Sequence, residues 1–524
     1  MSSLNNTPAL LRSLIVYAIT VPLAILVGYM LTGLDQTSVF WIAVIVGVMV
    51  FPLLLRFHYQ LLLFSWAAPI LLFFVPARPQ LFIMMAAASL GISVTERILS
   101  SQKRFLSAPQ ITAPALAMLG VIIMTAEMTG GIGVKSMGGS VYGGKKYIMI
   151  IIGILSFFAL IARPIPKEKV KLYFGLYLAG LGLSFVQDLY ALAPGPFKFI
   201  YLFFNFSGNG MDESGHTSFE LGTTHLSGFA ATGSALSSLM LVIYGIRGVF
   251  MGGKLWRPIV LIISVCMLFL GGQRTPIIVF LLLFSVLFWL EDLHRSRLIL
   301  PFVAAAIIGS LLIIPMAKHL PYTFQRSLAF LPLDIDASAR ASADDSSEWR
   351  LKIWEALLPE VPKHLLLGTG LAIDVETLNE MGGNTTFKVI DAANQPLALS
   401  HDVHNGPLSI ILPFGIWGIL AWLWFWAGIL YVLLRNYKYG DPDLKLYNRF
   451  LLASFLANCL FFTFIFGAME HVAGFCLLGG LSVAINHGVR GPSQVKAPNK
   501  PQVFAGAKPA NRPYLGPGIR PGKA

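Results

Sequence analysis

Long apolar runs recur along almost the whole chain and constrain its fold more than any other feature. Each run has roughly the 17–25 residues that an α-helix needs to cross the hydrocarbon of a bilayer. The weak ten-residue alternation of an outer-membrane barrel does not appear. The pattern therefore predicts an all-α polytopic membrane protein with about 12–14 transmembrane helices. The expected spans are approximately 11–31, 38–55, 60–76, 79–96, 110–127, 147–162, 171–190, 226–246, 256–272, 275–291, 298–316, 416–434, 447–466 and 469–487.

Composition supports this class. Of the 524 residues, 56% are hydrophobic and only 12% are charged, and the mean hydropathy is +0.72. A water-soluble globule of this size needs more polar surface than that. The first run follows only Arg12 and has no small-residue cleavage site after it, so we expect a retained span and not a signal peptide.

The basic residues predict the orientation in the membrane. If the N-terminus is inside, the inner connections hold 18 Lys and Arg, and the short outer connections hold six. This asymmetry is the one that the positive-inside tendency predicts. We therefore expect a multi-pass membrane protein with both termini in the cytoplasm. The net charge of +13 indicates contact with membrane lipids and not with nucleic acid.

Four regions follow from the span map. Residues 1–316 form an N-terminal transmembrane bundle of about 11 spans with an outer loop at 191–225, and residues 416–487 form the C-terminal transmembrane helices. Residues 317–415 form a large periplasmic loop with surface helices. The last region, 488–524, has seven Lys or Arg, seven Pro and no acid, which predicts a disordered basic cytoplasmic tail.

Both long outer loops carry polar residues suited to binding. The stretch 317–402 contains 12 of the 25 acidic residues, and loops of this length in a compact protein are usually functional or disordered. The loop at 191–225 carries Asp212 and His216, which are candidates for the rim of a binding site, although a solvated loop would contain such residues as well.

Within the large loop, the segment "DDSSEWRLKIWEALLPEV" predicts a short helix. Asp345 or Ser346 would cap this helix, and Arg350 and Trp354 would share one face near its positive N-terminal end. Together these two side chains would attract an anion. The expected apolar stripe is Leu351, Trp354, Leu358 and Val361. Further along, Gly368 and Gly370 allow a tight turn or a close backbone approach.

Two histidines, an aspartate and an asparagine stand before the next long apolar run, in "LSHDVHNGPLSIILPFG". The span map predicts a surface helix from Gly406 or Pro407 to Pro413, with Gly415 and Gly418 at the bend into the next span. His404 and Asn405 would then face the outer membrane surface at the start of this helix.

A third candidate is Arg274 in "LFLGGQRTPIIVF", which sits between two adjoining spans at the same outer level. Each candidate also has a structural interpretation: Arg274 as a headgroup anchor, Arg350 as a solvated helix face and His404 as a helix cap. Their joint position at one level of the membrane favours a functional site.

Other chemistries have little support. The spacing in "HDVH" is compatible with a metal site, but no HExxH or further ligand cluster accompanies it. Cys266, Cys459 and Cys476 all fall inside apolar runs, and the chain has no GxSxG elbow or P-loop. We therefore expect neither a metal nor another cofactor.

The succession "GGQR", "EWRLKIWEALLPEVPKHLLLGTGL" and "HNGPLSIILPFGIWGIL" resembles the O-antigen ligase and O-antigen polymerase superfamily of bacterial envelope glycosyltransferases. The resemblance covers roughly residues 260–435. The family's motifs fall here on Arg274, on Arg350 with Trp354 and the Gly368/Gly370 turn, and on His404/Asn405 with Gly415/Gly418. One departure is "PKHLLLGTG", where the family more often has Pro directly before the leucines.

The resemblance implies a donor glycan on undecaprenyl pyrophosphate and a glycan, lipid or protein acceptor at the periplasmic face. In that interpretation Arg274 and Arg350 pair with the pyrophosphate, and His404 is a general base or a donor that orients the acceptor hydroxyl. Asn405 holds His404 in position, and whether the protein is a ligase or a polymerase stays open.

Two other classes remain possible. A transporter or flippase for lipid-linked sugars would place charged groups near the bilayer midplane. In the span map, Glu127, Asp188 and Glu470 lie toward outer ends of spans and Glu96 toward an inner end, which favours a one-sided site. A structural scaffold in an envelope complex would leave the arginine and histidine cluster unexplained.

Overall fold

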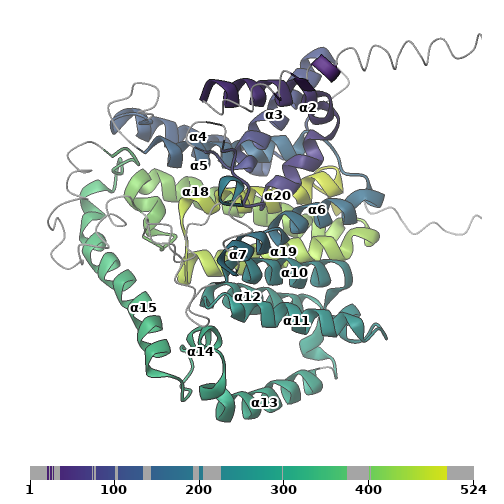
Figure 1. Ribbon diagram of the computed structural model, residues 1–524, viewed down its shortest axis with the longest axis vertical. Coiled ribbons are helices and arrows are strands. Elements are labelled where there is room, and N and C mark those ends of the chain that lie inside the picture. Colours follow the sequence, from purple (N-terminus) through teal and green to yellow (C-terminus); the bar gives the residue numbers. More distant parts are fainter. Residues whose placement is uncertain are drawn as a thin grey trace, which may run out of the picture.

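The computed structural model describes residues 20–22, 24, 25, 28, 36–73, 75, 78–100, 104–133, 143–192, 200–204, 226–297, 299–373, 401 and 403–492. Within these residues the fold is helical and contains no β-strand, apart from two isolated bridges that join Ile70 to Phe204 and Leu71 to Gln80. Figure 1 shows most of the helices stacked side by side in one bundle.

The described helices are α2 (Gln36–Ser65), α3 (Leu81–Leu99), α4 (Pro109–Met128), α5 (Gly144–Ile161), α6 (Val170–Gly182), α7 (Phe185–Leu192), α9 (Ile200–Phe203), α10 (Ser227–Phe250), α11 (Trp256–Leu270), α12 (Arg274–Leu290), α13 (Ile299–Met316), α14 (Tyr322–Leu328), α15 (Ala337–Leu357), α18 (Leu408–Tyr439), α19 (Lys445–Phe464) and α20 (Val472–Asn486). Short 3₁₀ turns join several of them, among them η2 (Lys167–Lys169), η3 (Leu293–Arg295), η4 (Ala317–His319) and η9 (Met469–His471).

Nine helical segments of the described chain are long and apolar enough to cross a membrane. Two more apolar helices, α11 and α12, are shorter. The predicted class, an all-α polytopic membrane protein, is confirmed.

The main apolar core lies between α2–α6, α10, α12 and α18–α20. Close helix contacts depend on small residues: a Cβ at Gly428 of α18 would lie 1.9 Å from the carbonyl oxygen of Gln110 in α4. By contrast, α13 has no buried residue and lies at the edge of the molecule, between α12 and α14 in the chain (Figure 1). The bundle is therefore compact around α18, whereas α13 has no fully buried residue and packs on the core through Phe302.

The two ends of the bundle differ. We call the end where α12 and α18 begin the loop end, because residues 317–373 and 401–407 adjoin it, and the opposite end the tail end, because residues 487–492 lie there. At the loop end α15 extends along the side of the molecule from α14 toward the start of α18 (Figure 1). The loop end therefore gathers every described residue of the large loop.

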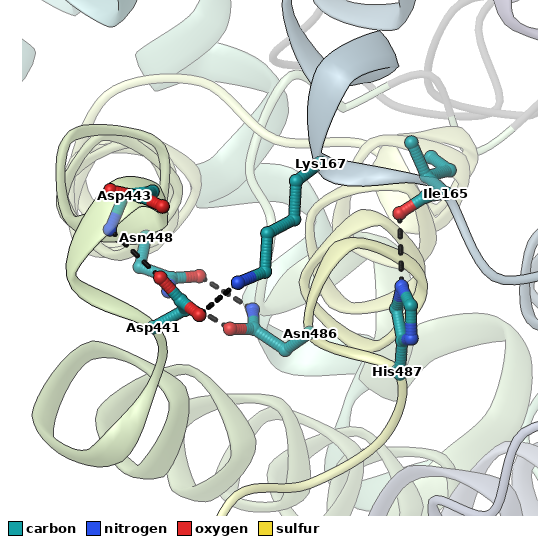
Figure 2. Close-up of polar contacts among 7 residues, drawn as sticks. All are labelled: Ile165, Lys167, Asp441, Asp443, Asn448, Asn486 and His487. Atoms are coloured by element: carbon teal, nitrogen blue, oxygen red, sulfur yellow. Dashed lines mark hydrogen bonds and ion pairs between the residues drawn. The ribbon is translucent and has the colours of Figure 1, made fainter. Parts of the chain in front are cut away.

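At the tail end, buried amides join the last helices (Figure 2). Asn486 Nδ2 donates to Asn448 Oδ1 at 2.7 Å, and Asn448 Nδ2 donates to Asn486 Oδ1 at 3.1 Å. Nearby, Lys167 pairs with Asp441, and the His487 ring bonds the carbonyl oxygen of Ile165 at 3.1 Å. These contacts fix the ends of α18, α19 and α20 against the turn before α6.

The predicted separation of 38–55 from 60–76 is wrong, because α2 is one helix from Gln36 to Ser65. Two polar residues between the two predicted spans are buried helical residues: His58 Nδ1 lies 2.8 Å from Ser89 Oγ, and the Tyr59 hydroxyl donates to the carbonyl oxygen of Leu160 at 2.7 Å. The described residues from Trp66 to Gln80 are not helical.

Some predictions concern residues outside the described part of the chain. They are most of the first span at 11–31, the outer-loop candidates Asp212 and His216, and the tail beyond residue 492.

Candidate functional site

Arg274 is the first residue of α12 and follows a glycine turn. Gly272, at φ +60°, has a conformation that favours glycine and lets the chain reverse between α11 and α12. The Arg274 guanidinium then reaches α15, where Nη2 donates to the carbonyl oxygen of Ala343 at 2.7 Å and to Ser347 Oγ at 3.0 Å. Arg274 thus joins the bundle to the large loop.

The loop helix α15 is longer than the sequence predicts. It begins at Ala337, and its cap is Asp336, whose Oδ1 accepts from the backbone N–H of Ser338 at 2.8 Å. The predictions of a cap at Asp345 or Ser346 and of Arg350 near the positive end of the helix are therefore wrong. The early "ASARASA" stretch has no apolar periodicity, but its Ala and Arg residues favour a helix.

The buried face of α15 also differs from the predicted stripe. Leu351 and Leu358 are 59% and 57% exposed, whereas Ile353 is fully buried and Leu357 nearly so. Trp354 does pack on this cluster, and its Nε1 donates to the carbonyl oxygen of Val403 at 2.7 Å. Trp354 therefore ties α15 to the segment that carries the two histidines.

Arg350 lies on the same face of α15 as the contacts of Arg274. Ala343, Ser347 and Arg350 are spaced by four and three residues, so that Arg350 is about 10 Å along the helix from Ala343. Its guanidinium carbon lies 5.2 Å from the ring centre of Trp349. Its Nε is buried and has no hydrogen-bond partner among the described residues. A buried, unsatisfied N–H on a cation favours an anionic ligand.

Arg326 on α14 completes the group and was missed by the sequence analysis. Its Nη1 donates to the carbonyl oxygen of Gly272 at 2.8 Å, and its Nε donates to Ser342 Oγ at 3.0 Å. Arg326 thus joins the turn before Arg274 to α15. Because α14 has only seven residues and no motif, nothing in the sequence distinguishes Arg326 from the other basic residues of the loop.

The three arginines repel one another. Burial lowers the pKa of Arg350, and the charges of Arg274 and Arg326 lower it further. Burial likewise lowers the pKa of Arg326, with a contribution from Arg274. No carboxylate of the described residues forms an ion pair with Arg274 or Arg350. The site is therefore strongly positive and suited to an anion.

His404 lies beside this site. Its backbone has φ +52°, and its ring meets Trp349 edge-on at 5.1 Å and Phe466 at 4.6 Å between ring centres. Trp349 therefore contacts both Arg350 and His404. Neither Trp349 nor Phe466 was among the predicted site residues; Trp349 lies next to Arg350 in the quoted motif, but Phe466 is far away in the sequence.

Asn405 caps α18. Its Oδ1 accepts from the backbone N–H of Leu408 at 3.1 Å, which fixes the turn that follows His404. The predicted bend at Gly415 is present, because this residue alone within α18 has non-helical angles, φ +62° and ψ −159°. The segment before the bend is buried and is not the surface helix that the sequence predicted.

Gly368 and Gly370 place a turn against this bend. Both have positive φ, +74° and +71°, and a Cβ at Gly368 would lie 2.3 Å from the carbonyl oxygen of Pro413. Between them, the Thr369 N–H donates to the carbonyl oxygen of Leu412 at 2.9 Å. Free backbone groups at the bend of α18 are thus satisfied by the glycine turn.

His401 secures the same turn. Its Nε2 lies 2.8 Å from Thr369 Oγ1. Burial, together with the charges of Lys146 and His364, lowers the pKa of His401 to about 4, so its ring is neutral at physiological pH. Among the described residues, no group of three or more His, Cys, Asp or Glu side chains lies close enough together to hold a metal ion.

Residues 259–423 match the family model of the O-antigen ligase. This segment is therefore similar to the O-antigen ligase family. The O-antigen ligase domain spans α11 to the first half of α18 and contains Arg274, Arg326, Arg350, His401 and His404. A search of curated proteins finds no match to the chain.

The apolar helices show an integral membrane protein, and its segment 259–423 is similar to the O-antigen ligase family. The structure brings Arg274, Arg350 and His404 of the O-antigen ligase domain together around α15. Trp354, Asn405, Gly368 and Gly370 hold these elements in place through the contacts described above.

Proposed function

We propose that the protein transfers a glycan from an undecaprenyl-pyrophosphate carrier to an acceptor hydroxyl at the periplasmic face of a bacterial inner membrane. The observation that carries the proposal is the pair of half-buried arginines, Arg274 and Arg350, that have no carboxylate partner among the described residues and lie beside His404. An anion at the end of a membrane bundle fits a lipid pyrophosphate, whose phosphates lie at headgroup level.

Sidedness supports the periplasmic face. The tail end carries basic connections, including Arg163, Lys167, Lys445 and Arg449, which the positive-inside tendency places in the cytoplasm. The loop end, with Arg274 and His404, is then periplasmic.

The reaction requires one bond to break and one to form. The acceptor oxygen attacks the anomeric carbon of the donor glycan, and the bond from that carbon to the pyrophosphate oxygen breaks. The proton of the acceptor hydroxyl passes to the His404 ring, and undecaprenyl pyrophosphate leaves with the bonding electron pair. Arg274 and Arg350 stabilise the charge that develops on the leaving pyrophosphate, a role that needs no metal ion.

The transfer assay tests this assignment. Arg274→Ala, Arg350→Ala and His404→Ala should each reduce transfer from a pyrophosphate-linked donor in vesicles by about 100-fold or more, as expected for the loss of one transition-state contact. Arg326→Gln should lower transfer less, because Arg326 acts through the position of Gly272 and α15. A chelator should leave transfer by the wild-type protein unchanged.

Lys352→Ala is the matched control, because Lys352 is a basic residue on α15 that pairs with Glu348 at the surface. It should retain wild-type transfer. Full activity in the Arg274, Arg350 and His404 variants at normal membrane abundance would refute the assignment.

A transporter or flippase is the alternative. In the described spans the carboxylates lie near helix ends, among them Glu96, Glu127 and Glu291. This distribution favours a one-sided site over a path through the membrane. Net movement of lipid-linked sugar across sealed vesicles, without glycan transfer, would favour the transporter.

The acceptor distinguishes ligase from polymerase. Deletion of a polymerase leaves single glycan units on the surface, whereas deletion of a ligase leaves long chains on the lipid carrier. Analysis of both glycan pools in a deletion strain therefore decides between these two enzymes.

A further inference from the structure

A cavity of about 310 Å³ lies inside the bundle, between α6, α10, α12, α19 and α20. None of the residues proposed for catalysis lines it. Its walls are mostly apolar and aromatic, and they include Tyr177, Leu283, Phe450 and Phe475. Protein interiors contain few voids of this size, and cavities of this volume commonly bind ligands, so we expect a ligand here.

The cavity is tall and narrow. On α19 its lining extends from Phe450 to Phe462, a rise of about 18 Å along the helix. This distance is more than half of the hydrocarbon thickness of a bilayer, roughly 30 Å. The cavity therefore extends from the loop end toward the middle of the membrane.

The upper part of the cavity lies under the arginine site. Its lining on α12 consists of Val279 and Leu283, five and nine residues after Arg274, so it begins about one and a half turns along α12 from Arg274. On the other side it is lined by His471, whose ring lies 5.8 Å from that of Phe466. Phe466 in turn contacts His404. The cavity thus begins below Arg274 and near His404, two of the three residues proposed for catalysis.

Two of the polar side chains in the lining bond back to their own helices. Ser234 Oγ donates to the carbonyl oxygen of Ala230 at 3.1 Å, and Asn458 Nδ2 donates to that of Ser454 at 2.7 Å. These bonds satisfy the Ser234 hydroxyl and the Asn458 amide N–H without a ligand. The surface that remains suits hydrocarbon and not a sugar or an ion.

Small residues leave the space open. A Cβ at Gly474 would meet no atom within 4 Å. Ser238 of α10 also lines the cavity with a short side chain. Larger side chains at either position would extend into the cavity.

We infer that this cavity binds the part of the isoprenoid chain next to the pyrophosphate of the donor lipid. The inference rests on the proposed function, because it takes the arginine site as the pyrophosphate site. The arginine site suits an anion at the membrane surface, and the apolar cavity, which we call the slot, extends below it. Together they fit one amphipathic, anionic lipid. The slot orients the pyrophosphate by holding the first isoprene units.

The test compares donors of different chain length. Wild-type protein should use an undecaprenyl-pyrophosphate donor with a kcat/KM at least tenfold above that for a donor with a two-isoprene chain, because burial of two methylene groups already accounts for a tenfold difference. Ser238→Phe and Gly474→Leu fill the slot and should reduce this ratio to near one. Because the assay reads a ratio, a smaller folded fraction does not affect it.

Leu460→Phe is the matched control, because Leu460 is on α19 but is 42% exposed and does not line the cavity. It should keep the wild-type ratio. A ratio near one in the wild-type protein, or a wild-type ratio in both slot variants, would overturn the inference and leave the proposed function intact. Failure of the wild-type protein to use any pyrophosphate donor would refute the proposed function itself.

The other candidate occupant is the acyl chain of a membrane phospholipid. A photoreactive residue at position 238 should crosslink to the undecaprenyl-pyrophosphate donor in vesicles that contain both lipids. Crosslinking to phospholipid alone, at saturating donor, would also overturn the inference.

Discussion

At the scale of single residues, the candidate site depends on Arg274 and Arg350, which have no carboxylate partner in the described part of the chain. Arg350 and Arg274 were predictable because each lies in a recognisable motif at the outer level of the span map. Arg326 was not, because its importance comes from two contacts, with Gly272 and Ser342, that join segments far apart in the sequence.

The neutral state of His401 gives a pH-dependent stability. A histidine whose pKa falls from its ordinary 6.5 to about 4 on folding binds protons more readily in the unfolded chain. The stability that the neutral His401 ring gives to the folded state is fully present above pH 6.5 and is lost as the pH falls toward 4. We expect the apparent thermal midpoint in detergent to fall more between pH 7.5 and 5 for the wild-type protein than for His401→Gln.

The comparison with His401→Gln isolates this group, because all other titrating residues are the same in both proteins. Glutamine also keeps a side-chain donor for Thr369 Oγ1. An equal fall in midpoint for the two proteins would show that His401 is not held neutral.

At the scale of elements, the sequence predicted helices well where apolar periodicity is strong. It predicted them poorly where contacts with other helices determine whether a helix continues or breaks. The break in α2 was predicted at Arg56–Gln60, but burial of His58 and Tyr59 continues the helix through these polar residues. A similar long-range effect acts on α10. Its break at Gly245 is stabilised by Glu291, which accepts from the backbone N–H of Ile246 at 2.9 Å.

The bend of α18 is an element that the sequence did predict. Gly415 marks it because φ +62° with ψ −159° is a conformation available essentially to glycine alone. A Cβ there would also lie 2.6 Å from the carbonyl oxygen of Leu365. Gly415→Ala should therefore destabilise the protein by about 1–3 kcal/mol and displace the Gly368–Gly370 turn.

Thermal unfolding in detergent measures this effect, with Gly120→Ala of α4 as the control. A Cβ at Gly120 would meet no atom within 4 Å, so alanine there should be neutral or slightly stabilising. Equal midpoints for the Gly415 and Gly120 variants would contradict the described bend.

At the scale of the whole molecule, the two ends of the bundle are built differently. At the loop end, Arg274 and Arg350 have no carboxylate partner among the described residues, whereas the tail end satisfies its buried amides with one another. The sequence predicted the class and one-sided site, because span length and charge sidedness are properties of the chain as a whole. It did not predict the amide network, whose partners, Asn436, Asn448 and Asn486, come from three helices.

We expect this network to stabilise the fold without serving the reaction. Asn448→Ala removes the partner of both the Asn486 side chain and the Asn436 carbonyl oxygen, and should lower the free energy of unfolding by about 1–3 kcal/mol. Transfer activity per folded molecule should stay at the wild-type level, because the network lies at the opposite end from Arg274. Thermal unfolding and transfer assays on one purified sample measure both quantities.

The exposed Lys445→Ala, three residues earlier on α19, serves as the control and should leave the thermal midpoint unchanged. Loss of activity per folded molecule in Asn448→Ala, with an unchanged midpoint, would mean that the tail end takes part in the reaction.

The indole of Trp349 contacts the guanidinium of Arg350 on one side and the ring of His404 on the other. In the proposed reaction, this rigid indole would therefore fix the distance between the leaving pyrophosphate and the acceptor hydroxyl. A smaller side chain at this position would let that distance vary even if every charged group stayed in place.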